Sequence, residues 1–453
     1  MRRWITCAAV LLAAVSCAKL PVPRTVVPDD YIFGETFSRD SFPRDVRWWE
    51  YFADTTLNRL EEMAIAGNLD LAAAASRVEA ARKNLPIARA AYLPTVNFEA
   101  SASGGHDPDE GSTERYAITP VLSWELSLFG ALRASDHAAR AGIRISEWAF
   151  RGVALSLTAQ VAITYFTLLK YERGLEIARR TCELRRESAA LVDSMFRYGM
   201  ASGVARDQAH SLVYTAAADV EQYRRSVDQT VSALAVLLGE NPRKIELEGW
   251  SARLDRNRLP DEVPVGLPSD LLTRRPDVVE AMYRADQAAA RVGLARAVRF
   301  PRITLTGSGG LLASSLKGLT TGDPWGWSAG GTLMQPLFAF GKLKRQEEVA
   351  RENYYEALFG YEQALLQALS DVESALVGIT TGRSQLEQIR KLAAVDEAAA
   401  RKTRALYRSG MAAYLDVIDA ERSWYESELN LSELVAQQYI DYVVLFKALG
   451  GGW

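Results

Sequence analysis

The sequence predicts a mostly α-helical protein with a small β part, and three observations support this fold class. Two halves of the chain resemble each other at a nearly fixed spacing. Long stretches of each half contain no proline, and each half has one short region in which apolar and polar residues alternate. Alternation is typical of strands, whereas long proline-free stretches are typical of helices. We therefore expect one unit, a β-hairpin followed by a long and a shorter helix, to occur twice.

The internal repeat is visible in pairs of similar segments that lie 211 residues apart. Residues 128–130 resemble 339–341, and residues 196–201 resemble 407–412. Upstream, residues 88–94 resemble 295–301 at a spacing of 207, so the change of four residues falls in the intervening region, where a loop can absorb it. A spacing that persists over so much of the chain indicates a true duplication.

Proline placement and apolar spacing define the helices. Proline is absent from Val121 to Asn241 and from Leu337 to Trp453, and a proline inside a helix costs about 3 kcal/mol. We expect long helices over 131–198 and 342–408 and shorter helices over 206–238 and 415–449. Each long helix should end at a glycine, Gly199 or Gly410. A coiled-coil seam, in which only the arginine is unsuited to burial, is formed by Thr164, Leu168, Tyr171, Leu175, Ala178, Cys182, Arg185, Ala189, Val192 and Phe196.

The alternating regions predict β-hairpins over 95–127 and 302–337, with strands long enough to cross a bilayer at a tilt. Aromatic residues near the strand ends suit a membrane interface, and ordinary core aromatics are the alternative: Trp124, Phe129, Trp325, Trp327, Phe338 and Phe340. Four strands cannot close a barrel, and lipid does not tolerate an open sheet edge. Three copies would supply twelve strands, enough for a pore, whereas two would supply eight, whose side chains nearly fill the interior.

The N-terminus predicts export. Residues 1–16 have the basic start and short apolar core of a signal peptide. The segment Ala14-Val15-Ser16-Cys17 resembles a bacterial lipobox, which implies cleavage before Cys17 and lipidation of that residue; a plain secretory leader is the alternative. No later apolar run is long enough for a transmembrane helix, and the one remaining cysteine, Cys182, excludes a disulfide framework.

Other function classes find no support in the sequence. The net charge of −3 gives no basic field for nucleic acid. His106, His137 and His210 lack a metal-ligand spacing. No nucleophile elbow, phosphate loop or zinc-protease motif is present. We therefore expect neither an enzyme nor a resident cofactor or metal.

Several motifs together resemble a known family. They include Trp48-Trp49, 68–71, 88–94, Leu271 to Val278 with its Arg-Arg-Pro-Asp segment, 410–422 and 448–453. With these segments the chain resembles the TolC-like outer membrane factors, closest to their OprM- and NodT-like lipoprotein branch, over nearly all of the mature sequence.

The resemblance implies a homotrimer with a twelve-stranded transmembrane β-barrel and a periplasmic α-barrel. An equatorial belt would draw on 17–53, 240–268 and the extreme C-terminus, and the two repeats would span 54–239 and 269–453. It also implies a lipid-anchored channel of the outer membrane in a tripartite efflux system. The channel would work with a periplasmic adaptor and an inner membrane pump, and drugs, toxic organics or metal ions would leave through it. A channel for type I protein secretion and a non-conducting periplasmic lipoprotein are the alternatives.

The resemblance also implies site residues near the two helical turns. Asp416 and Asp419 match positions that form carboxylate rings at a closed periplasmic gate, and Tyr407 matches a gate latch, with Arg408 beside it. Alternatively, Asp416 caps a helix and Asp419 is merely solvated. In the first repeat Ala205 stands opposite Asp416, so a latch there would either be weaker or use Arg206 and Asp207.

The turns themselves match the adaptor contacts of the family, so the resemblance assigns that contact to Gly199, Met200, Gly410 and Met411. Simple helix capping by the two glycines would be compatible with the same pattern. Pro86 interrupts the first helix, and we expect it to produce a kink.

Overall fold

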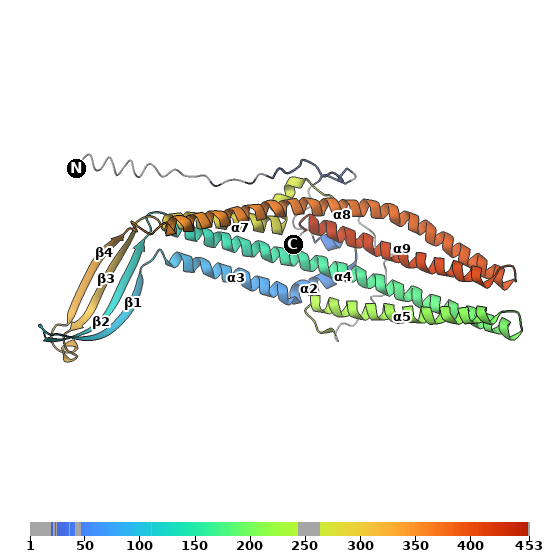
Figure 1. Cartoon of the computed structure of the whole chain (residues 1–453), viewed down its shortest axis with the longest axis horizontal. Coiled ribbons are helices and arrows are strands. Elements are labelled where there is room, and N and C mark those ends of the chain that lie inside the picture. The colour runs from blue at the N-terminus through green and yellow to red at the C-terminus, as the bar shows by residue number, and fades with distance from the viewer. Residues whose placement is uncertain are drawn as a thin grey trace. The chain divides into compact units, whose positions relative to one another are not determined.

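The computed structural model describes residues 20, 23, 25–35, 37–40, 47–109, 111–242 and 263–451. The predicted signal peptide, Cys17, part of the 17–53 segment and most of 240–268 lie outside these residues. Within them the protein is mostly helical, with one four-stranded sheet (Figure 1). This confirms the predicted fold class.

A short 3-10 helix, η1 (Trp48–Phe52), precedes the first repeat. The first repeat contains α2 (Thr55–Gly67), α3 (Leu69–Ala90), β1 (Thr95–Asp107), β2 (Gly111–Leu126), α4 (Ala131–Arg197) and α5 (Gly203–Leu237). The long helix thus agrees with the expected 131–198 to within one residue. The shorter helix begins three residues before the expected Arg206, because the Ser202 hydroxyl accepts a hydrogen bond from the Ala205 N–H and caps it.

The second repeat contains η3 (Pro268–Asp270), α6 (Leu271–Arg274), α7 (Pro276–Ala297), β3 (Arg302–Ala313), η4 (Lys317–Leu319), β4 (Trp325–Met334), α8 (Lys342–Arg408) and α9 (Tyr414–Ala448). The bounds of α8 are those the sequence predicted, and α9 is shifted by one residue at each end. Pro86 lies inside α3, which continues to Ala90.

The strands form a sheet in the order β1-β2-β3-β4, and every neighbouring pair is antiparallel. β1 is exposed along its whole length and β4 along nearly all of it. Within the described residues these two strands each have one strand partner, so the sheet has two open edges. A long open edge is a template for pairing with another chain.

Compact units of the chain do not follow the two repeats. One unit comprises residues 1–26, 79–145 and 280–363, and the other comprises 27–78, 146–279 and 364–453. Each unit therefore takes segments from both repeats, and α4 and α8 contribute to both. The first unit contains the sheet, and the second contains the helical turns.

The core of the second unit is aromatic. Trp48 and Phe52 of η1 are fully buried, and Trp48 stacks on Phe446 of α9 with 5.6 Å between ring centroids. Phe52 lies 5.2 Å from Phe166 of α4, which stacks on Tyr439 at 4.8 Å. Burying a large aromatic side chain stabilises a fold by roughly 1.5–3 kcal/mol. These ring contacts therefore hold η1 against α4 and α9.

The Arg-Arg-Pro-Asp segment also connects helices of this unit, through hydrogen bonds of Arg275. The Arg275 side chain is buried and donates to Asp277 at 2.6 Å and to Asp371 of α8 at 2.9 Å. It also donates to the carbonyl oxygen of Ala448 at 3.2 Å, which satisfies one of the free carbonyls at the end of α9. A single guanidinium thus joins the start of α7, the middle of α8 and the end of α9.

One stretch of α4 is long and apolar enough, by length and composition alone, to cross a membrane. The sequence had led us to expect no such segment after the signal peptide. Of that stretch, 61% is buried inside the protein, as in the core helix of a helical bundle. Cys182 is also buried on α4 and forms no disulfide.

Candidate functional site at the helical turns

Two equivalent turns connect α4 to α5 and α8 to α9. Gly199 has φ +72° and Gly410 has φ +75°, a conformation that glycine adopts without a steric penalty. After each glycine the next N–H bonds back into the helix, from Met200 to Met195 at 2.8 Å and from Met411 to the carbonyl of Leu406 at 2.9 Å. The glycines therefore have the capping role that their position predicts.

Both turns present methionine to the outside. Met200 is 65% exposed and Met411 is 72% exposed, and no atom lies within 4 Å of a Cβ built on Gly199 or Gly410. The predicted adaptor-contact residues are thus accessible in one copy of the chain. Methionine is flexible and polarizable, and it suits an apolar contact surface.

The two helix starts after the turns are capped in different ways. In the first repeat the Ser202 hydroxyl accepts from the Ala205 N–H at 3.1 Å. In the second, Ala413 replaces serine, and the Asp416 carboxylate reaches back to accept from the Ala413 N–H at 3.0 Å. Each repeat therefore has one half of the reciprocal capping box. The capping role considered for Asp416 is present in the structure.

Asp416 and Asp419 are both exposed on α9 and lie one turn apart. Asp419 lies 3.7 Å from the Arg422 guanidinium, and both side chains are largely in solvent, so this pair holds the carboxylate only weakly. In one copy the two carboxylates leave most of their charge facing solvent.

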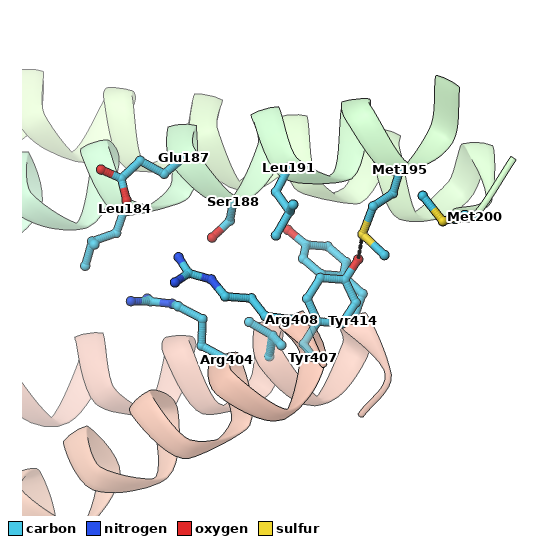
Figure 2. A pocket seen from close by; sticks show the side chains of 11 residues that line it. Leu184, Glu187, Ser188, Leu191, Met195, Met200, Arg404, Tyr407, Arg408 and Tyr414 are labelled. Carbon is cyan, nitrogen blue, oxygen red and sulfur yellow. Dashed lines mark hydrogen bonds between the residues drawn. The ribbon is translucent and has the colours of Figure 1, made fainter. Parts of the chain in front are cut away.

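The Tyr407 side chain is buried and not exposed to solvent. Its hydroxyl lies 3.4 Å from the Met195 sulfur on α4, and its ring centroid lies 5.3 Å from that of Tyr414 (Figure 2). Burial raises the pKa of the Tyr407 hydroxyl, and burial together with Glu421 raises the pKa of Tyr414 to about 12. Both phenols are therefore neutral at physiological pH. The surrounding core is formed by Ala189, Val192, Ala209, Tyr407 and Val417.

A cavity of about 550 Å³ adjoins this core between α4 and the α8–α9 pair. Figure 2 shows the guanidinium groups of Arg404 and Arg408 extending into it beneath α4. Its lining is formed by Leu184, Glu187, Ser188, Leu191, Met195, Met200, Arg404, Tyr407, Arg408, Tyr414 and Val417. The cavity lining thus includes two predicted gate residues of α8, Tyr407 and Arg408, and the predicted contact residue Met200, but neither Asp416 nor Asp419.

An ion pair between Arg404 and Glu421, which the sequence pattern does not predict, joins α8 to α9. Arg404 donates to one Glu421 oxygen from Nη2 at 2.6 Å and from Nε at 3.0 Å. The Glu421 side chain is only 8% exposed. Glu421 belongs to the segment that was singled out for Asp416 and Asp419, yet nothing in the sequence reveals that it faces α8 instead of solvent.

Arg185, the one residue unsuited to the predicted seam, is buried on α4. Its guanidinium donates to the carbonyl oxygen of Leu212 on α5 at 3.2 Å and lies over the ring of Tyr425 on α9. The Tyr425 hydroxyl in turn donates to Asp219 of α5 at 3.2 Å. The exception in the pattern therefore marked a residue that links three helices.

The first-repeat residues considered for a latch pair with each other. Arg206 lies 3.0 Å from Asp207, and its guanidinium lies 4.7 Å from the ring centroid of Phe196. The histidines are dispersed: His106 contacts Ser112, His137 lies near Asp286 and His210 contacts Asp193. In the described ranges no group of three or more histidine, cysteine or acidic residues could hold a metal ion.

Comparison with known proteins places these features in context. The family model described as outer membrane efflux protein matches residues 60–240 and 267–451. The solvent efflux pump outer membrane protein SrpC of Pseudomonas putida is 34% identical over 412 residues, which cover 89% of this chain and 87% of that protein. The probable outer membrane lipoprotein SilC of Salmonella typhimurium is 31% identical over 416 residues, covering 90% of this chain and 89% of that protein. The structure of the outer-membrane channel OprN has a TM-score of 0.89 at 28% identity and covers 96% of this chain and 100% of that chain.

Proposed function

Because the chain belongs to the outer membrane efflux protein family, we propose that it is the passive exit duct of a tripartite efflux system. Three copies would join their strands into one twelve-stranded barrel and their helices into one periplasmic tunnel. The family consists of outer membrane channels that work with efflux pumps. A duct needs no catalytic residues, and the energy for transport would come from an inner membrane pump.

The observation that carries this proposal is the four-stranded sheet with an exposed strand at each edge. In lipid every backbone donor and acceptor must be paired, so a sheet in the membrane has to close. One chain has too few strands for closure, and identical copies supply the remainder. Twelve strands leave an interior wide enough for a pore, whereas eight do not.

We place the gate at the helical turns and the adaptor contact beside it. Asp416 and Asp419, repeated in three copies, would form two rings of carboxylates that favour cations. Tyr407 would hold the closed state by fixing the end of α8 against Met195 of α4. The exposed Met200 and Met411 would meet the periplasmic adaptor.

The exported substrate class is small molecules. The relatives are named for solvents, toluene, antibiotics and cations, which favours small-molecule efflux over protein secretion. The anchor would be Cys17, as the lipoprotein name of SilC supports.

Planar-bilayer conductance tests the duct. Purified full-length protein is reconstituted, and single-channel conductance is recorded for the wild type and for the Asp416→Asn, Asp419→Asn double variant. We expect a small conductance that rises in the variant. Protein that assembles but never conducts in either form would support the alternative of a non-conducting periplasmic lipoprotein.

A further inference from the structure

We propose that the internal repeat determines which residues meet where two copies join: β4 of one copy pairs antiparallel with β1 of the next, with Thr332 opposite the partner's Ser101. The inference rests on the proposed assembly of identical copies and adds the register of the joint, that is, which residue lies opposite which. It follows from comparing contacts inside one chain with the same positions one repeat further along.

The two hairpins have the same register. In the first, Thr95 of β1 lies opposite Ser123 of β2. Adding the two repeat spacings, 207 for the first strand and 211 for the second, gives residues 302 and 334. Arg302 of β3 does lie opposite Met334 of β4. The spacings read from the sequence therefore describe the strand pairing as well.

A side-chain hydrogen bond between the end of one strand and the residues that precede its neighbour also occurs in both repeats. The Trp124 indole donates to the carbonyl oxygen of Tyr92 at 3.0 Å. At the equivalent positions, the Gln335 amide donates to the carbonyl oxygen of Arg299 at 3.1 Å. The donor has changed from indole to amide, but the backbone acceptor is the same. Equivalence of the repeats therefore extends to the junctions between strands and helices.

Inside the chain, the joint between the repeats is the β2–β3 ladder, in which Val121 lies opposite Ser308. The corresponding joint at the other side of each repeat would bring β4 against a β1. Adding 211 to residue 121 and subtracting 207 from residue 308 gives Thr332 and Ser101. These residues lie on the two exposed strands of the sheet, so the joint inside the chain predicts the joint between copies.

The predicted register passes a geometric requirement of a closed barrel. Opposed residues share one face of a sheet, and a register change by an odd number of residues moves every side chain to the other face. The observed ladders lead from Asn97 to Val121, then to Ser308 and Ser328. The predicted joint leads from Ser328 to the partner's Gly105. Positions 97 and 105 differ by an even number, so the same residues face lipid all around the ring.

An aromatic contact beside the internal joint predicts a second contact between copies. Phe129, which follows β2, stacks on Phe300, which precedes β3, with 4.9 Å between centroids. The equivalent of Phe129 is Phe340, and the equivalent of Phe300 is Leu93. Phe340 is fully exposed with φ +47°, and Leu93 is 67% exposed. Phe340 of one copy therefore covers the partner's Leu93, as Phe129 covers Phe300.

Disulfide cross-linking of full-length protein in its membrane tests the register. In a Cys182→Ser background, Thr332→Cys with Ser101→Cys is expected to give covalent oligomers that persist in SDS without reducing agent. Thr332→Cys with Ser103→Cys, shifted by two residues on the same face, is the off-register control. Val121→Cys with Ser308→Cys is the matched standard, because it is the equivalent pair inside one chain and reports whether this geometry allows a disulfide.

We expect the 332/101 pair to cross-link at least tenfold faster than the 332/103 pair. Faster cross-linking of the 332/103 pair would overturn the register. The proposed function as a duct would still stand if the protein conducted in planar bilayers. Protein that remains monomeric by native mass spectrometry would remove both. Phe340→Ala should lower the assembled fraction several-fold. Unchanged assembly would mean that lipid covers Phe340 instead of Leu93, and would overturn the aromatic contact.

Discussion

Asp136 and Glu347 occupy the same position in the two repeats, 211 residues apart, and each carboxylate lies between two arginines. Asp136 accepts from Arg89 at 2.8 Å and from Arg140, one helical turn later, at 2.7 Å. Glu347 accepts from Arg299 at 2.5 Å and from Arg351, one turn later, at 2.9 Å. In both repeats the triad ties the residues before a hairpin to the helix that follows it.

We predict that Glu347→Gln destabilises the folded protein by about 1–3 kcal/mol, because the amide removes the negative charge and turns a donor toward one of the two arginines. Asp136→Asn should cost less, since Arg89 and Arg140 are more than half exposed. Arginine hydrogen bonds lower the pKa of Asp136, and they lower that of Glu347 against the opposing effect of burial. The stabilisation should therefore be complete above the ordinary carboxyl pKa and disappear as the pH falls below it. Denaturation followed by circular dichroism between pH 3 and pH 7 measures this, and a pH-independent difference would contradict it.

The opposite pH dependence is expected for Glu61 of α2. Its side chain is fully buried, neither carboxylate oxygen has a hydrogen-bond partner, and burial raises its pKa well above the ordinary value. A raised carboxyl pKa means that the folded state prefers the protonated form, so stability is lost as the pH rises above the ordinary carboxyl pKa. Glu61→Met should stabilise the protein by about 1–3 kcal/mol, and by more at pH 8 than at pH 5. Glu62→Met, on the exposed neighbour, is the control. A destabilised Glu61→Met variant would indicate a cationic partner in the assembled channel.

The Arg404–Glu421 pair should behave as one unit. Arg404→Ala alone leaves a nearly buried carboxylate uncompensated and is expected to cost about 3–5 kcal/mol. The double variant Arg404→Ala, Glu421→Ala should cost clearly less than the two single losses added together. A double-mutant cycle by chemical denaturation measures the coupling. Strict additivity would mean that the pair contributes nothing. Arg401 and Glu397, exposed on the same helix, are the matched control pair.

The charge of the proposed gate can be changed without removing the helix cap. Asp416→Asn retains an oxygen that can accept from the Ala413 N–H, so the start of α9 should remain folded. With Asp419→Asn it should raise conductance and reduce block by trivalent cations at least tenfold. Glu183→Gln, which removes an exposed acid of α4 away from the turns, serves as the control. Unchanged block in the double variant would contradict carboxylate rings.

Lipidation of Cys17 is tested by mass spectrometry of the mature N-terminus. We expect cleavage before Cys17 and a mass increase that corresponds to a diacylglyceryl group and an amide-linked acyl chain. Cys17→Ala should abolish the increase while the channel still assembles. An unmodified mature cysteine would support the plain secretory leader.

Much of the architecture was predictable because it depends on local patterns. Proline-free stretches and apolar spacing located α4 and α8 to within one residue, since a helix satisfies its own backbone hydrogen bonds. Alternation located the hairpins, and two spacings between similar segments anticipated their common register. The glycines of the turns were predictable because a left-handed backbone strongly favours that residue.

Tertiary structure alone decided which polar residues are buried and what they meet. Glu421 and Asp419 lie two positions apart on α9, yet one pairs with Arg404 in the interior and the other faces solvent. Likewise, Arg185 interrupts an apolar seam, and its partners, Leu212 and Tyr425, lie on two other helices. A sequence specifies the period of a helix and hence its faces, but the contacts across those faces depend on helices that are distant in the chain. Their pairing is fixed only when the helices pack.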